Sequence, residues 1–276
     1  QARLAKLKAN LVISEIMYHP SARIDGQNLE YVELYNATPF SNRLEGLRLG
    51  GDIEYAFSDQ DVLAPFGYRV VAKEPASIQA VYGVTNVAGP FSGSLPDGDG
   101  QLQLLNAQGA VLLDINYSDA SPWPLAADGA GHSLVLARPS FGEAYPQSWA
   151  ASALLGGSPG GPETPGPALY APVVINEVLA HTDPLQCDYI ELFNASTQTM
   201  DLSGCFLSDE AGTNKFVLPG GTLIPGGGFA VFYEGVEATN FTFSLLAAGE
   251  DVYFRAPQTT VVDCVRFPAQ ENGVAW

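Results

Sequence analysis

The sequence is poor in basic side chains. Its 276 residues hold 12 Lys and Arg against 30 Asp and Glu, so the formal net charge is −18. A chain this acidic is repelled by the phosphates of nucleic acids and by anionic membrane surfaces. We therefore expect no nucleic-acid partner. The acidity suits solubility and would suit divalent cations, although solvated surface charge explains it equally well.

Long apolar runs are also missing. No stretch approaches the ~20 residues needed to cross a bilayer, so we expect no membrane insertion. The only cysteines are Cys187, Cys205 and Cys264, and they form no Cys-x-x-Cys pair or Cys/His metal motif. One disulfide with a remaining thiol and three free thiols both fit this set.

Catalytic signatures are equally scarce. No His-Glu-x-x-His motif surrounds His19, His132 or His181, which we interpret as exposed loop residues. Residues 97–100 (Asp-Gly-Asp-Gly) resemble part of a calcium loop. Position 12 counted from Asp97 is Gln108 rather than Glu, so a hairpin turn is the better interpretation. We find no nucleophile–base arrangement and predict that the chain is not an enzyme.

What the sequence does contain is an internal repeat. Residues 30–38 (EYVELYNAT) return as 188–196 (DYIELFNAS), and 12–16 (VISEI) return as 174–178 (VINEV). Such self-similarity indicates one folding unit used twice. Short alternating apolar runs between Gly/Pro turns predict an all-β chain with a β-sandwich in each half. Residues 75–82, with Ile78, Val81 and Tyr82 at helical spacing, predict a short helix in the first half only.

Composition suggests where the units begin and end. Residues 1–10 are basic helix formers, which we interpret as a linker or the tail of a preceding helix. The first sandwich is expected at 11–161, a Gly/Pro linker at 162–171 and the second sandwich at 172–276. A strand predicted at 133–137 has no counterpart before Trp276, so we expect the second sandwich to be incomplete at its C-terminus.

Three pairs of carboxylates recur at matching positions of the repeats: Glu15 with Glu177, Glu33 with Glu191, and Asp114 with Asp263. A carboxylate within an apolar strand is costly unless it is paired or hydrogen-bonded. Together these side chains could hold Ca²⁺, or they could accept backbone N–H groups and fix the sandwich. We favour the structural role, because no loop supplies the six to eight oxygens that Ca²⁺ takes.

Aromatic side chains offer one more candidate site. Trp123 lies in Ser-Pro-Trp-Pro (121–124), a predicted loop, and is the best single candidate for an exposed contact with a sugar or another ligand. Aromatic residues of a sandwich more often belong to the core, and we favour that interpretation.

The repeated motifs resemble a known family. ISEIMYHP (13–20), EYVELYN (30–36), VINEV (174–178), YIELFN (189–194) and DLSG (201–204) are similar, in this order, to the lamin-tail domain in its bacterial form. The resemblance covers nearly the whole chain. It implies two tandem immunoglobulin-like β-sandwiches with no catalytic constellation and no cofactor.

The resemblance also shapes the expected function. It implies a non-catalytic module of a larger extracellular or cell-surface bacterial protein, used in adhesion, spacing or presentation of a neighbouring domain. Its partners would be a protein or cell-surface ligand and other domains of the parent chain. The alternatives are a binding module for carbohydrate or another surface ligand, assisted by Ca²⁺, and an accessory domain of a secreted hydrolase or a spore-coat-kinase-like protein.

Overall fold

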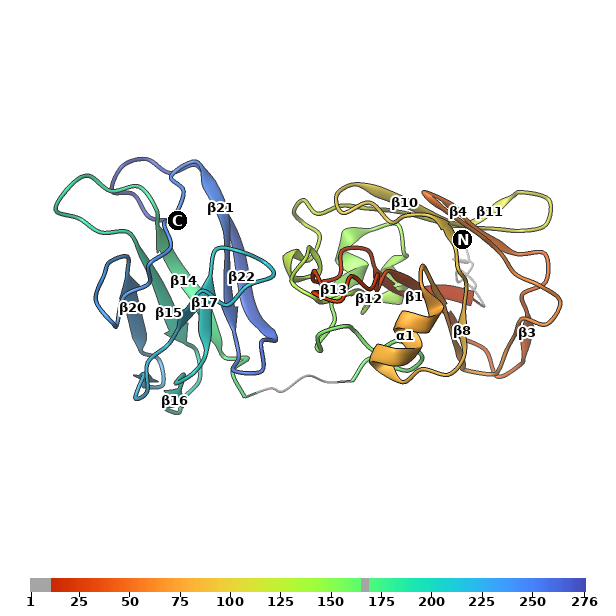
Figure 1. The fold of residues 1–276 in the computed structure, drawn as a ribbon, viewed down its shortest axis with the longest axis horizontal. Coiled ribbons are helices and arrows are strands. Elements are labelled where there is room, and N and C mark those ends of the chain that lie inside the picture. Colours follow the sequence, from red (N-terminus) through yellow and green to blue (C-terminus); the bar gives the residue numbers. More distant parts are fainter. Residues whose placement is uncertain (1–10, 165–168) are drawn as a thin grey trace, which may run out of the picture. The chain divides into compact units, whose positions relative to one another are not determined.

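The computed structural model describes residues 11–164 and 169–276. The chain divides into two compact units, residues 1–164 and 165–276, each of which is described by itself (Figure 1). The predicted N-terminal segment 1–10 and part of the predicted linker 162–171 lie outside the described residues.

The first unit is built from two principal sheets. One has the order β13-β12-β1-β2-β7-β8 and the other β11-β10-β4-β5-β9. The strands of the first sheet are β1 (Leu11–Met17), β2 (Tyr31–Asn36), β7 (Tyr68–Ala72), β8 (Val87–Ala88), β12 (Leu134–Leu136) and β13 (Trp149–Ala151). Those of the second are β4 (Arg48–Gly51), β5 (Ile53–Ala56), β9 (Ser92–Gly93), β10 (Gly100–Leu105) and β11 (Val111–Tyr117), and β3 (Asn42–Arg43) pairs separately with β6 (Val62–Leu63).

Alternation of side chains places the core between these sheets. Ile13 and Val32 from the first sheet are fully buried in the same cluster as Leu49, Leu102 and Ile115 from the second. Residues two apart in a strand share a face, so each strand sends every second side chain inward. The all-β prediction is confirmed in this unit.

A helix covers the outer face of the first sheet. α1 (Pro75–Tyr82) begins with Pro75 in its first turn and ends at Gly83, which has φ 70°. Ile78 is fully buried in a second apolar cluster with Tyr31 and Val70, and Tyr82 packs against that cluster. This is the helix that the spacing of apolar residues predicted.

The second unit repeats the plan with fewer elements. β14 (Val173–Leu179), β15 (Tyr189–Asn194) and β20 (Phe229–Tyr233) form one sheet. The other has the order β18-β17-β21-β22, and β16 pairs with β19. The bounds are β16 (Met200–Asp201), β17 (Phe206–Ser208), β18 (Phe216–Val217), β19 (Leu223–Ile224), β21 (Gly249–Arg255) and β22 (Val261–Pro268). Between the sheets lies a core that includes Ile190, Leu192 and Phe254.

The two units share strand register as well as order. β1 pairs with β2 and β14 with β15 in the same antiparallel register, each with a bulge just before the matched glutamate, Glu15 or Glu177. The repeat seen in the sequence therefore reflects one folding unit built twice, as predicted.

The outer edges of β1 and β14 differ. β12 pairs with β1 at Ile16. In the second unit the N–H of Val178 donates to the C=O of Trp276 at 3.1 Å, and the N–H of Trp276 donates to the C=O of Val178 at 2.9 Å. Asp263 and Gln270 accept the N–H groups of Ile175 and Ala180, so side chains satisfy part of this edge. Incompleteness of the second sandwich stays a prediction. Among the described residues, no helix has the length and apolar character needed to span a bilayer.

Candidate functional site

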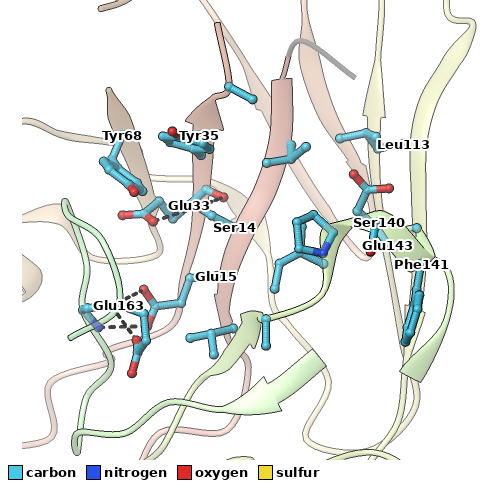
Figure 2. Close-up of a pocket in the computed structure, with 18 of the residues that line it drawn as sticks. Ser14, Glu15, Glu33, Tyr35, Tyr68, Leu113, Ser140, Phe141, Glu143 and Glu163 are labelled. Carbon is cyan, nitrogen blue, oxygen red and sulfur yellow. Dashed lines mark hydrogen bonds between the residues drawn. The ribbon is translucent and has the colours of Figure 1, made fainter. Parts of the chain in front are cut away.

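A cavity of about 550 Å³ lies on the first unit, over the outer surface of β1 and β2. Figure 2 shows Glu33, Tyr35 and Tyr68 on one side of β1 and Phe141 with Glu143 on the other. The rings of Tyr35 and Tyr68 stack with centroids 4.7 Å apart. The lining is thus partly aromatic and partly acidic.

Glu33 lies at the base of this cavity, where its side chain is only 1% exposed. Ser14 Oγ donates a hydrogen bond to Oε1 at 2.7 Å, and the backbone N–H of Gly160 donates to Oε2 at 2.6 Å. Burial, together with the nearby charge of Glu15, raises the pKa of Glu33 to about 8. Both oxygens are therefore occupied by donors of the protein itself.

Glu15 stands directly across the strand pair from Glu33 and is 2% exposed. Tyr31 Oη donates to Oε1 at 2.6 Å, and the backbone N–H of Ser158 donates to the same oxygen at 3.0 Å. The hydroxyl of Ser133, just before β12, is a third donor. Burial raises the pKa of Glu15, although these donors oppose the rise.

The segment that meets both glutamates, residues 156–160, requires glycine at position 157. Gly157 has φ +75°, and a Cβ there would overlap the Glu15 carboxylate and the hydroxyls of Tyr31 and Ser133. Gly157 therefore lets residues 156–160 lie flat on the sheet. The pair Glu15 and Glu33 holds this segment down through its backbone N–H groups.

The second unit has the same pair with less cover. Glu177 and Glu191 face each other across β14 and β15, and both are half-buried. The hydroxyl of Tyr189 donates to Glu177, and Asn176 Nδ2 donates to Glu191 Oε1 at 2.8 Å. These contacts repeat those of Tyr31 with Glu15 and of Ser14 with Glu33.

The third predicted match, Asp114 with Asp263, is wrong by one residue. Leu104 pairs with Leu113 and Phe254 with Asp263 at corresponding places, because both hairpins contain a bulge after that pair. Asp114 is exposed and accepts hydrogen bonds from Gln101 and Gln103. Asp263, by contrast, is half-buried and accepts the N–H of Ile175, so the two aspartates have different surroundings.

Trp123 is only 8% exposed and packs in the core, with its ring 6.3 Å from that of Trp149. This is the interpretation favoured from the sequence, and the alternative of an exposed contact is excluded. The prediction that the three histidines are exposed is wrong. His132 is buried, and its Nδ1 lies 2.6 Å from the carbonyl of Ser152. His19 and His181 are half-buried rather than exposed.

One serine in this region fits a catalytic pattern that sequence reasoning missed. Residues 156–160 (Gly-Gly-Ser-Pro-Gly) match the letters of the Gly-x-Ser-x-Gly nucleophile elbow. That elbow requires a strand before the serine and a helix after it, but residues 156–161 belong to neither a strand nor a helix. Ser158 Oγ donates to Glu163 Oε2 at 2.7 Å, so the match carries no triad geometry.

Metal ligation has little support from this geometry. Within residues 11–164 and 169–276, no group of three or more His, Cys, Asp and Glu residues lies close enough to hold an ion. Cys187, Cys205 and Cys264 are free thiols. In these ranges the matched glutamates form pairs without a third acid. Donors of the protein occupy both oxygens of Glu33 and the Oε1 atoms of Glu15, Glu177 and Glu191.

Comparison with known proteins identifies the family. No curated protein matches the chain. The family model described as Lamin Tail Domain matches residues 5–119 and 167–268, well over half of the chain. Lamin tail domains are immunoglobulin-like β-sandwiches, typically structural or interaction modules rather than enzymes. The chain therefore belongs to the lamin tail domain family and carries two tandem copies of the domain.

Proposed function

We propose that the chain is a non-catalytic interaction module of a larger extracellular or cell-surface protein, whose sandwiches space and present binding surfaces. The observation that carries this proposal is the use of the matched acids. Glu15 and Glu33 hold the segment 156–160 on the first sheet, so the most unusual polar groups of the chain serve its architecture. The tandem lamin tail domains support the same role.

Location can be tested on intact cells that make the parent protein. Protease added outside the cells should cleave the parent protein between its repeats, near residues 162–171, while a cytoplasmic marker in the same cells stays whole. Protection of the parent protein equal to that of the marker would contradict the extracellular assignment. The assay needs no knowledge of the ligand.

A carbohydrate or another small surface ligand is the second candidate, and the cavity of the first unit favours it. The stacked rings of Tyr35 and Tyr68 line one side of the cavity and exposed Phe141 the other, and such aromatic surfaces suit the face of a sugar ring. A panel of soluble oligosaccharides should raise the melting temperature of the first unit if this candidate is right. Tyr68→Ala should remove the effect, and Tyr233→Ala in the second unit is the matched control.

Catalysis is the third possibility, because Glu33 lines a cavity and has a raised pKa. A general acid must come within hydrogen-bond distance of its substrate. Glu33 is nearly inaccessible, and Gly160 and Ser14 occupy its oxygens. We therefore expect no hydrolysis of chromogenic ester, glycoside or phosphate substrates. Turnover that Glu33→Gln abolishes would reverse this assignment.

A further inference from the structure

The outer surface of the three-stranded sheet in the second unit is apolar and exposed. Phe229, Val231 and Tyr233 of β20 are 53%, 38% and 48% exposed, while Phe232 between them points into the core. The rings of Phe193 and Phe229 lie 4.7 Å apart, and those of Tyr189 and Tyr233 lie 5.9 Å apart. We call this set the aromatic face: Tyr189, Phe193, Phe229, Val231 and Tyr233.

Half of the corresponding surface of the first unit is covered by the protein itself, whereas Tyr35 and Tyr68, which pair as Phe193 and Phe229 do, stay half-buried in the cavity. Glu33 pairs with Val70 as Glu191 pairs with Val231, yet Val70 is 1% exposed. Ile78 of α1 packs in the cluster that contains Val70, and Gly160 donates to Glu33. A helix and residues 156–160 thus remove Tyr31, Glu33 and Val70 from water, whereas their counterparts in the second unit are half-buried or exposed.

The second unit has no such cover among residues 169–276, where the structure places no helix. An exposed set of neighbouring aromatic side chains on a sheet is typical of an interaction site. Aromatic residues also dominate the energetic centres of protein interfaces. The shape of this surface is one that a short amphipathic helix fits, since α1 fits its counterpart.

The charge of the second unit indicates what kind of partner could bind the aromatic face. Residues 165–276 contain 13 acidic and three basic side chains. Lys215 pairs with Asp209, Arg266 pairs with Asp251, and Arg255 is buried on β21. The charges next to the aromatic face are those of Glu177 and Glu191. A partner that covers this face meets negative charge, and a second copy of this acidic chain would be repelled.

We propose that the aromatic face docks a basic amphipathic helix from a partner protein. Its apolar side chains would cover Val231 and Phe229, as Ile78 covers Val70 in the first unit. Its Lys or Arg side chains would pair with Glu191 and lie over the rings of Tyr189 and Tyr233. This inference rests on the proposed role as an interaction module, for which it names the surface and the partner chemistry.

The test uses the full chain, labelled for NMR, and a synthetic amphipathic helix of leucine and lysine. Chemical-shift changes should concentrate on β15 and β20. Val231→Ser and Tyr233→Ser should each weaken binding by about tenfold or more. Val217→Ser, at a 53% exposed position of β18 on the other sheet, is the matched control and should bind like the wild type. The same helix with glutamate in place of lysine should not bind.

Three results would overturn the proposal. Equal binding by wild type and Val231→Ser would mean that the peptide meets the acidic surface at large. A dimer in sedimentation that Val231→Ser dissociates would assign the face to a second copy. Shifts at β20 caused by oligosaccharides but not by the peptide would assign it to sugar. Each result leaves the protease test of cell-surface location unaffected, so the two proposals fail separately.

Discussion

The two repeats carry the same sheet, with the same pair of glutamates, in different surroundings. In the first unit α1 and residues 156–160 bury Glu33, Tyr31 and Val70. In the second unit the counterparts Glu191, Tyr189 and Val231 are half-buried or exposed. The comparison shows which features belong to the sandwich common to both units and which belong to its cover, α1 and residues 156–160, found among the described residues in the first unit alone. Both units keep two sheets around an apolar core with or without the cover, whereas the cover decides which surface is left to meet a partner.

A side chain added at Gly157, where residues 156–160 contact the first sheet, should have the largest effect on the stability of the first unit. In Gly157→Ala the new methyl group overlaps the Glu15 carboxylate, and the φ of +75° strains any side chain. We expect the first unit to lose ~3 kcal/mol of unfolding free energy, measured by denaturant titration with probes in each unit. Gly161→Ala meets no atom within 4 Å and is the control. Equal stability of the two variants would mean that the segment is not held to the sheet.

A smaller side chain at Ile78 of α1 should have the next largest effect on stability. Ile78→Ala removes a fully buried side chain from the cluster under α1 and should cost ~2–4 kcal/mol in the first unit. Val81→Ala, on the exposed side of the same helix, should cost little. Binding of a hydrophobic dye to Ile78→Ala would show that the uncovered first sheet resembles the second. A loss confined to the second unit would contradict the comparison.

The stability of the first unit should depend on pH through Glu33. The folded-state pKa of Glu33, about 8, lies above its ordinary value of 4.5, so folding retains a proton that the unfolded chain releases. This stability is complete below pH ~4.5 and is lost as the pH rises to about 8, by up to ~1.4 kcal/mol per pH unit.

The pH dependence can be measured by melting the wild type and Glu33→Gln between pH 4 and 9. Glu33→Gln carries no charge, so the first unit should lose less stability in this range than in the wild type. Glu191→Gln, at the matching half-buried position, is the control and should leave the first unit unchanged. Parallel curves for wild type and Glu33→Gln would show that Glu33 does not bind its proton as described.

Calcium should have the smallest effect. Because the described residues bring no third metal-binding side chain to either glutamate pair, EDTA and excess Ca²⁺ should each move either melting transition by less than ~1 °C. A Ca²⁺-dependent rise that Glu15→Gln or Glu177→Gln removes would instead identify a metal site. That result would restore the Ca²⁺-assisted alternative.

The sequence predicted the paired strands and glutamates that the two units share, and it missed that other segments cover them in the first unit only. Recurrence of Glu15 at Glu177 and of Glu33 at Glu191 placed both pairs correctly, since strand order preserves register. Asp114 was matched to Asp263 by residue type alone, whereas the shared register of the two hairpins makes Leu113 the counterpart of Asp263.

Which residues are buried was harder to predict from the sequence than which strands pair. Residues 156–160 have the composition of a linker, and their Gly and Pro residues gave no sign that their N–H groups bind carboxylates. The alternation of β2 and β15 is the same, although one is covered and the other is not. Trp123 follows a proline in an irregular segment, yet it packs beside Trp149, a contact that only the tertiary fold creates.

The hold of Glu15 and Glu33 on residues 156–160 has a mechanical consequence. These residues are the last part of the first unit to touch its sheet before the chain passes to the second unit. When the second repeat is pulled, tension reaches Glu163 first, whose carboxylate accepts from Ala153 N–H and Ser158 Oγ, and then the N–H groups of Ser158 and Gly160. Only after these bonds break does the tension reach β13, the strand that precedes this segment. Residues 156–160 would then lengthen the tether while both sandwiches stay folded.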